Sequence, residues 1–288
     1  MKKTVFSLAI LGLILVVVGF IGMSSKNFNF GDKLTEYHKK WTIDNDTLSH
    51  LIVNSEYTTD IEFIQSTDGT QSIELKGLFE DEVISQLNKV QPQKGEFKIN
   101  MVDDSITFFS ISFKSQTATL TVSLPDLEQL QEVGLHFTSS NGIVTNLNAK
   151  DIEITSRSGN IELHSIFANK LRIEADSGNI TASDIQGNTK AYIKSGNMDI
   201  KNYAGEGIFR SHSGNINLTQ KGSSSLDLSA KSGNVTLAAD PDFNGFYDLA
   251  AQSGNINSPI SLGSSNDSIK VRTNSGDINI TQDNRDVL

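Results

Sequence analysis

The sequence predicts an all-β protein, a β-solenoid of stacked rungs of 18–22 residues behind a single N-terminal transmembrane helix. Three observations predict this fold. A Ser-Gly-Asn motif recurs six times, and once more as Ser-Gly-Asp. Apolar residues alternate on both sides of each motif, and an uncharged apolar stretch lies near the N-terminus.

The repeat spacing is regular enough to define one structural unit per motif. Successive motifs are separated by 19, 18, 18, 19, 21 and 22 residues. A unit of this length cannot bury its own apolar side chains, so the repeats are expected to stack. The motifs begin at Ser158, Ser177, Ser195, Ser213, Ser232, Ser253 and Ser275.

Apolar residues alternate around each serine, which is the period of a strand rather than of a helix. We expect four inward columns, at six and four residues before the serine and at three and five residues after it. Three positions after the serine the column reads Ile161, Ile180, Met198, Ile216, Val235, Ile256 and Ile278. Four positions before it the column reads Ile154, Ile173, Ala191, Phe209, Leu228, Leu249 and Val271.

The motif has the residue types of a tight corner between two strands. Glycine adopts positive φ without steric cost, and stacked asparagine side chains would form a ladder in which each amide donates to the next. Asp277 would accept from such a ladder but not pass it on, so we expect its rung to end the stack. The corner residues are Gly159, Asn160, Gly178, Asn179, Gly196, Asn197, Gly214, Asn215, Gly233, Asn234, Gly254, Asn255, Gly276 and Asp277.

Residues 4–23 form an apolar stretch of bilayer length, about 30 Å as a helix. We expect an uncleaved anchor with the C-terminal part exported, because no A-x-A-like site precedes Ser24. A cleaved signal peptide and a buried core helix are the alternatives. The predicted domains are an anchor at 1–23, a juxtamembrane linker at 24–47 and a β-solenoid at 48–288, with irregular rungs and a cap at 48–147, regular rungs at 148–280 and a tail at 281–288.

The irregular part shows weaker patterns. Leu51, Val53, Ile61 and Phe63 resemble a degenerate rung, and Asp68-Gly69 is typical of a hairpin turn. Helical spacing of apolar residues predicts a capping helix over residues 79–90. Strands are expected at 97–101, 106–113 and 118–124, followed by an irregular rung around Ser140-Asn141-Gly142 that brings Ile143 into the array; the polar tail from Thr281 would cover the far end.

These features together resemble the bacterial "putative adhesin" family of unknown function, whose members carry stacked Ser-Gly-Asn/Asp-Ile rungs behind a signal or anchor. The strand at residues 120–124, which ends at Pro125 just before the rungs, is similar to the first strand of that family's repeat region. The resemblance covers about residues 48–280. It implies a surface-exposed β-solenoid of the cell envelope and brings no catalytic residues.

The outward residues carry only weak signals for chemistry. Asp227 and Asp248 are adjacent in one predicted outward column, but a solvated, salt-bridged face explains them better than a catalytic pair. Asp240, Asp242, Asn244 and Asp248 have the spacing of a calcium loop, yet its twelfth position is alanine rather than glutamate. The five histidines have no zinc-binding spacing. We therefore expect no catalytic residues, no cofactor and no metal beyond this weak calcium candidate.

Composition excludes further classes. The 288-residue chain has no cysteine, which excludes disulfides, thiolate metal sites and a lipid-modified cysteine anchor. A net charge of −10 opposes nucleic-acid binding. The preferred hypothesis is a non-enzymatic, membrane-anchored, extracytoplasmic binding or scaffold protein, whose partners would be the membrane through the N-terminal helix and a cell-wall polymer or envelope membrane proteins. An accessory of an envelope-stress response and a polysaccharide-acting enzyme are the alternatives.

Overall fold

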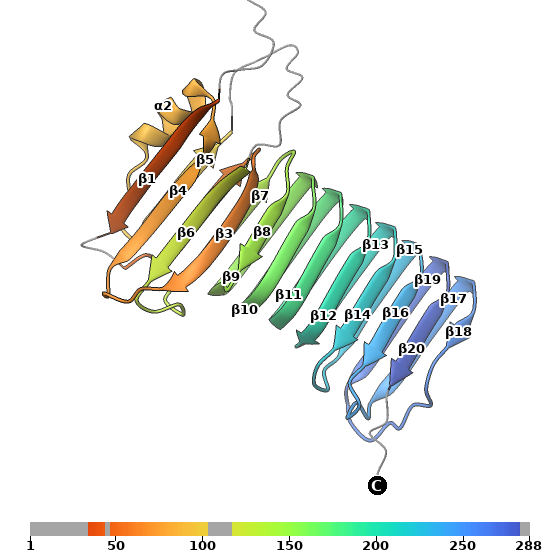
Figure 1. Ribbon diagram of the computed structural model, residues 1–288. Coiled ribbons are helices and arrows are strands. Elements are labelled where there is room, and N and C mark those ends of the chain that lie inside the picture. Colours follow the sequence, from red (N-terminus) through yellow and green to blue (C-terminus); the bar gives the residue numbers. More distant parts are fainter. Residues whose placement is uncertain (1–33, 44–46, 103–116, 283–288) are drawn as a thin grey trace, which may run out of the picture. The chain divides into compact units, whose positions relative to one another are not determined.

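Equivalent residues of successive repeats lie side by side in the computed structural model, which joins them through parallel strands (Figure 1). The serines that open the corners pair directly across these strands. Their spatial order is Ser158, Ser177, Ser195, Ser213, Ser232, Ser275 and Ser253. The predicted stacking of repeats is therefore confirmed, although the order in space differs from the order in the chain.

The structure describes residues 34–43, 47–102 and 117–282. Within this part, no helix is long and apolar enough to cross a membrane. The predicted span at residues 4–23, the strand predicted at 106–113 and the end of the polar tail lie outside the described residues. The described strands belong to one compact unit, Thr35–Asp104 with Ser115–Leu288.

The strands that precede the corners form one parallel sheet, which we term the upstream sheet. All of its pairs are parallel. In spatial order it contains β5 (Glu96–Met101), β2 (His50–Ser55), β7 (Glu132–Phe137), β9 (Asn148–Ser158), β10 (Ile161–Ser177), β11 (Ile180–Ser195), β13 (Gly207–Ser213), β15 (Leu226–Ser232), β19 (Ser268–Ser275) and β17 (Phe246–Ser253).

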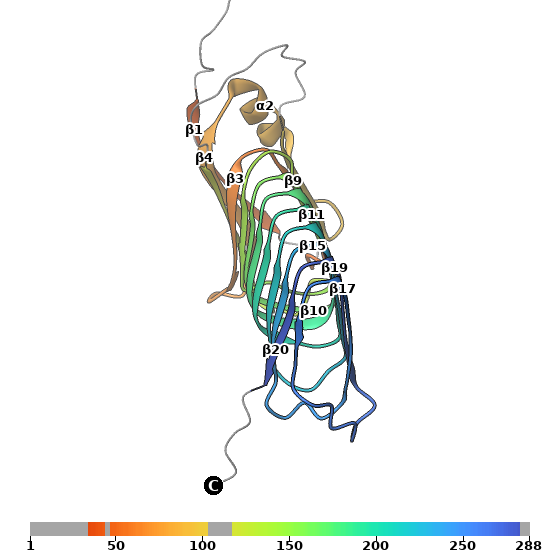
Figure 2. The same ribbon diagram turned by 90° about the vertical axis from the view of Figure 1, so that its right-hand side faces the viewer.

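The strands that follow the corners form the downstream sheet, and β10 and β11 are long enough to contribute one half to each sheet. Figure 2 shows the successive turns of the chain lying one behind another. The spatial order is β1 (Thr35–Ile43), β4 (Gln71–Phe79), β6 (Thr117–Leu124), β3 (Thr58–Gln65), β8 (Gly142–Thr145), β10, β11, β12 (Met198–Ala204), β14 (Ile216–Gln220), β16 (Val235–Ala239), β20 (Ile278–Gln282) and β18 (Ile256–Asn257). Only the β1–β4 and β4–β6 pairs are antiparallel among these.

The core lies between the two sheets. It includes the four predicted inward columns and a fifth, two residues before the serine, that was not predicted and contains Ser156, Ala175, Ile193, Ser211, Ala230 and Thr273. In six of the seven regular rungs the residues in these columns are buried. The exceptions all belong to the rung of Ser253, where Tyr247 and Leu249 are half-buried and Ile256 is 45% exposed. This rung has a neighbour on one side only, so its inward side chains lack a second layer.

The expectation that the Ser275 rung ends the stack is wrong. β19 pairs with β15 on one side and with β17 on the other, and β20 likewise lies between β16 and β18. Figure 1 shows β19 between β15 and β17. The last repeat of the chain is thus inserted between the two repeats that precede it.

A similar insertion occurs at the other end of the stack. The rung of β2 and β3 comes first in the chain, but it lies between the rung of β5 and β6 and the rung of β7 and β8. The predicted degenerate rung with Leu51, Val53, Ile61 and Phe63 is confirmed, and all four residues are buried.

The corner ladder exists, but its chemistry differs from the prediction. The backbone N–H of each corner asparagine donates to the side-chain Oδ1 of the neighbouring rung, at 2.8–3.0 Å from Asn160 to Asn234. Asp277 donates its N–H to Asn234 Oδ1 and accepts from Asn255 N–H at 2.7 Å. Because the side chain needs only an acceptor oxygen, aspartate continues the ladder as well as asparagine does.

The corner glycines are required by close backbone approach as well as by φ. Gly196 has φ +137°, and a Cβ placed there would lie 1.7 Å from Gly178 O of the neighbouring rung. No side chain fits this position, because the neighbour is rigid backbone rather than a movable side chain.

A second corner follows the downstream strands and was not anticipated. Asn146, Ser165, Asp184 and Asn202 occupy equivalent positions with φ between 54° and 59°. The residue after each of these positions, such as Tyr203 after Asn202, points into the core. Asparagine and aspartate tolerate this left-handed conformation better than most residues, so three of the four residues carried a readable signal.

The irregular rung at Ser140-Asn141-Gly142 is confirmed, with one shift of register. Asn141 Oδ1 begins the ladder by accepting from Asn160 N–H. Val144 is buried and Ile143 is half-exposed, the reverse of the prediction for Ile143. In this rung Gly142 takes the inward place, because the Phe137 ring fills the space where its Cβ would lie, 2.2 Å away.

The N-terminal end of the stack carries a helix, as predicted. α2 (Asp81–Lys89) buries Val83 and Leu87. Lys39 Nζ donates to the carbonyls of Leu87 and Asn88, and Trp41 Nε1 donates to Val90 O, so β1 satisfies the C-terminal end of the helix.

The turn at Asp68-Gly69 does not form a hairpin. β6 lies between β3 and β4, so the two strands that the turn connects are not paired. The turn itself is well defined. Thr70 donates to Asp68 Oδ1 through both its N–H and its hydroxyl, and these bonds with one from Ser66 lower the pKa of Asp68 to about 2.

The ladder can be tested at its middle rungs. We expect Asn197→Ala to destabilise the fold by about 1 kcal/mol, because Asn215 N–H loses its acceptor. Asn197→Asp keeps the acceptor and should unfold at nearly the wild-type denaturant concentration. Asn274→Ala, at an exposed outward position of β19, is the matched control. Equal destabilisation by Asp and Ala at position 197 would contradict the acceptor mechanism.

The buried phenol of Tyr203 predicts a loss of stability at high pH. Its hydroxyl donates to Gly187 O and Glu206 O, and burial raises its pKa to about 12. Because an unfolded tyrosine ionises near pH 10, the fold should lose on the order of 2 kcal/mol as the pH rises from about 10 to 12. Tyr203→Phe should lack this part of the loss, measured as denaturation midpoints at pH 9 and 11.5. An identical decrease in both proteins would assign the loss to other groups.

Candidate functional site

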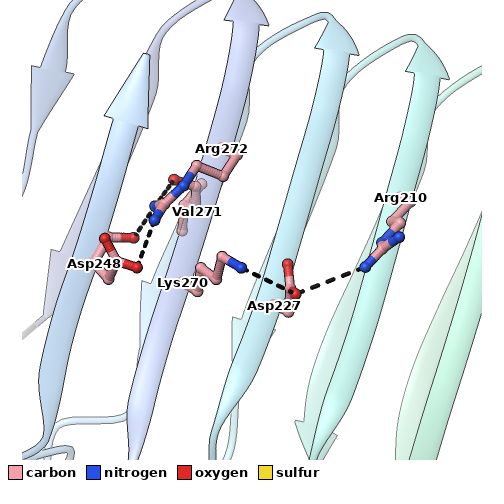
Figure 3. A network of polar contacts seen from close by, with 6 residues as sticks. All are labelled: Arg210, Asp227, Asp248, Lys270, Val271 and Arg272. Atoms are coloured by element: carbon pink, nitrogen blue, oxygen red, sulfur yellow. Dashed lines mark hydrogen bonds and ion pairs between the residues drawn. The ribbon is translucent and has the colours of Figure 1, made fainter.

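Two neighbouring groups of polar contacts lie on the outer face of the upstream sheet, one across β13, β15 and β19 and the other between β19 and β17 (Figure 3). Asp227 of β15 is at the centre of the first group. Its Oδ2 lies 3.8 Å from Arg210 Nη2 on one side and 4.0 Å from Lys270 Nζ on the other. Strand alternation places these side chains outward, because Leu226 and Leu228 on either side of Asp227 are buried.

Asp248 forms a separate pair at the end of the stack. Arg272 Nη2 donates to its Oδ2 at 2.5 Å, and Arg272 Nη1 donates to the backbone oxygens of Asp248 and Val271. The guanidinium thus neutralises the carboxylate and also holds the backbone of the terminal strand β17.

The predicted adjacency of Asp227 and Asp248 is wrong. In register, Asp227 lies opposite Lys270, and Lys270 lies opposite Asp248. The insertion of β19 therefore places a cation between the two acids. A pair of carboxylates that cleaves a glycosidic bond must converge on one substrate, and here each acid faces a basic side chain instead.

Further ion pairs lie on the rest of this outer face. Arg172 is paired with Glu174 and lies 3.7 Å from Glu153 of the neighbouring rung. Lys194 Nζ lies 2.6 Å from Asp176 Oδ1. These residues are exposed, so each pair contributes at most about 1 kcal/mol. These contacts agree with the expected solvated, salt-bridged face.

The outer face of the downstream sheet has a different character, which the sequence analysis did not single out. One of its columns contains small polar side chains in register on consecutive strands, and Asn257 Nδ2 donates to Asn279 Oδ1 at its end. The strand alternation around each corner could have revealed this column, which lies at the fourth position after the serine. The column begins with the larger Glu162 of β10 and continues with Thr181, Asp199, Asn217, Thr236, Asn279 and Asn257.

The residues of the weak calcium candidate have other partners. Asp240 accepts from the N–H groups of Asp242 and Gly222, and Asn244 O accepts from Ser264 N–H. The carboxylate of Asp248 is held by Arg272. Within residues 34–43, 47–102 and 117–282, no group of three or more His, Asp or Glu side chains is arranged to hold a metal ion.

The described histidines also lie apart from one another. His164 contacts Glu162 at 2.8 Å and Ser183 at 2.9 Å, and His136 contacts Thr155 at 2.8 Å. His38 lies against Glu74 in the antiparallel part of the downstream sheet. Each has an ordinary neighbour on its own or the next strand, as expected for a strand surface.

The model of the Toastrack DUF4097 family matches residues 48–281. The chain belongs to this family. The match begins just before β2 and ends within β20, so it covers the rungs at both ends of the stack. The matched range contains all seven corner motifs of this chain. No curated protein matches the chain.

Several solved structures are similar to the chain at low identity. A "putative adhesin" from Bacteroides fragilis and a "putative lipid binding protein" from Parabacteroides distasonis are each 14% identical, with a TM-score of 0.47. Each match covers 86% of this chain and 97% of the other. A "putative cell adhesion protein" from Clostridium sporogenes is 12% identical, with a TM-score of 0.35, and the match covers 87% of this chain and all of that one.

The paired acids predict a negative result for catalysis. We expect the purified full-length chain to release no reducing ends from cell-wall polysaccharide, and the Asp227→Asn, Asp248→Asn double variant to behave identically. Each of these substitutions, at the half-buried Asp227 and the exposed Asp248, should cost at most about 1 kcal/mol of stability. Release of reducing ends by the wild type that disappears in the double variant would establish a glycan-cleaving activity.

Proposed function

We propose that the chain is a membrane-anchored, extracytoplasmic scaffold of the bacterial cell envelope that binds extended partners without catalysis. One observation carries this proposal. The outer faces of both sheets are regular arrays with equivalent residues on neighbouring strands, and the acids described above are paired with basic residues. Such a surface offers many similar weak contacts, which suits a polymer or a long protein segment.

Two further features support the proposal. The apolar stretch at residues 4–23 has the length of a bilayer span, and the two lysines before it fit the positive-inside rule for the orientation that we propose. Membership of the Toastrack family supports the β-rich fold that the proposal requires. The downstream face, with its small polar column, is the candidate surface for an uncharged wall polymer, because hydroxyl and amide groups can both donate and accept hydrogen bonds.

A second candidate is an accessory role in a cell-envelope stress response. The layout of one N-terminal anchor followed by one β-domain resembles that of membrane-anchored proteins encoded with Gram-positive envelope-stress systems. In this role the protein would contact other membrane proteins rather than a polymer. Crosslinking in intact cells distinguishes the two roles by the chemical nature of what is captured.

The topology can be tested with a C-terminal tag on the full-length chain. We expect protease added to intact cells to remove the tag while the N-terminal remainder stays with the membrane fraction. A variant that lacks residues 4–23 is the control and should leave the membrane fraction. A tag that stays protected until the cells are lysed would place the β-domain in the cytoplasm and contradict the proposal.

A further inference from the structure

The two ends of the stack differ in how their apolar side chains are covered. At the N-terminal end Tyr37, Trp41 and Ile43 of the edge strand β1 are at most 8% exposed, and α2 packs nearby. At the other end the inward residues of β17 are only half-buried, and Ile256 of β18 is 45% exposed. The equivalent residues of the adjacent rung, Ile269, Val271 and Ile278, are buried.

More apolar surface lies beside this rung. Phe246 at the start of β17 is 51% exposed, and Ile260 and Leu262 in the loop after β18 are 88% and 70% exposed. The structure thus leaves a group of large apolar side chains at one end of the stack. Repeat proteins need a polar terminal face to stay soluble as single molecules, and a face of this kind marks an interface.

The backbone edge at this end is open along β17 alone. β18 has only two residues and is followed closely by Pro259, which has no N–H to donate and blunts that edge. The loop after β18 covers the start of β17, because Tyr247 N–H donates to Ser261 Oγ at 2.8 Å. The free edge therefore runs from Asp248 to Ser253, where β17 pairs only with β19.

The direction of the backbone groups on this edge follows from strand geometry. Phe246 N–H donates to Asp267 O, toward β19. Groups alternate along a strand, so the N–H and C=O of Leu249 and Ala251 point away from β19. These are the groups that an added strand would have to satisfy.

We propose that the β17 edge pairs antiparallel with the same edge of a second copy, around a two-fold axis at Ala250. In this register Leu249 of each copy faces Ala251 of the other, so the outward N–H and C=O groups of both residues bond in pairs. A large inward side chain then lies opposite a small one, and the half-buried residues of both terminal rungs cover each other.

The outward side chains also fit a second copy. Asp248 faces Gln252 in this register, so no two acids oppose each other across the axis, and Arg272 already neutralises Asp248. Parallel head-to-tail stacking would require the other end, which β1 and α2 cover. The contact therefore closes as a two-fold dimer rather than growing into a fibre. The inference is independent of the proposed binding function.

The absence of cysteine from the sequence makes a direct test possible, because any introduced cysteine is unique. In a two-fold pair at Ala250, the two Cα atoms of residue 250 would lie about 4.5 Å apart, within the range of a disulfide. We expect the full-length Ala250→Cys variant in detergent micelles to form a covalent dimer under mild oxidation.

Gln252→Cys is the matched control on the same edge. Its two copies would be displaced by about four residues along the strands, roughly 13 Å, which is too far for a disulfide. It should stay monomeric on denaturing gels, while the Asp248→Cys, Gln252→Cys double variant should form the dimer. Equal crosslinking of the two single variants would indicate random collision and overturn the proposal.

The uncrosslinked protein provides the second measurement. Sedimentation of the full-length wild type should give the mass of a dimer, and Leu249→Lys should shift it to a monomer while circular dichroism still reports the β-fold. A wild-type monomer at all concentrations overturns the proposal. In such a monomer, protection of the Leu249 and Ala251 amides from hydrogen exchange would show that the edge is covered by something other than a second copy.

Discussion

Each rung of this protein depends on its neighbours for both its apolar and its polar groups. In the regular rungs the inward columns are buried where a rung lies between two others, and they are only half-buried in the terminal Ser253 rung around Leu249. The corner N–H of each rung finds its acceptor on the adjacent rung. Stacking in register is therefore the constraint from which the core, the corners and the outer faces all follow.

Local chemistry made much of the fold predictable from the sequence. The alternation around each serine gave the inward columns, and the glycine in each corner gave the turn. The helix at α2 followed from its spacing, and its place beside β1 agrees with a capping role. These features depend on residues near one another in the chain, and their periods are short enough to be read directly.

The order of the rungs in space was not predictable in the same way, because it depends on the paths of the long loops between repeats. The only signs were indirect. The last two intervals are longer than the others, at 21 and 22 residues, and the Ser253 repeat has Ser258 where other repeats have an apolar residue. A terminal rung tolerates such a residue because no further layer covers it.

The error in rung order changed the interpretation of the candidate site. A carboxylate pair of Asp227 and Asp248 requires adjacent repeats, and Lys270 separates the two acids in the structure. The prediction that Asp277 ends the ladder is wrong because an internal rung requires only one acceptor oxygen, which Asp277 Oδ1 supplies.

The inserted position of the last repeat also constrains how the chain can fold during synthesis. The residues of β17 and β18 leave the ribosome before those of β19 and β20, yet β19 and β20 lie between them and the rest of the stack. The Ser253 repeat must therefore stay undocked, or release a temporary contact with β15, until β19 and β20 have been synthesised. A chain that stops before β19 would lack the strand with which β17 pairs. Such a truncated chain would therefore not form the same stack with fewer rungs.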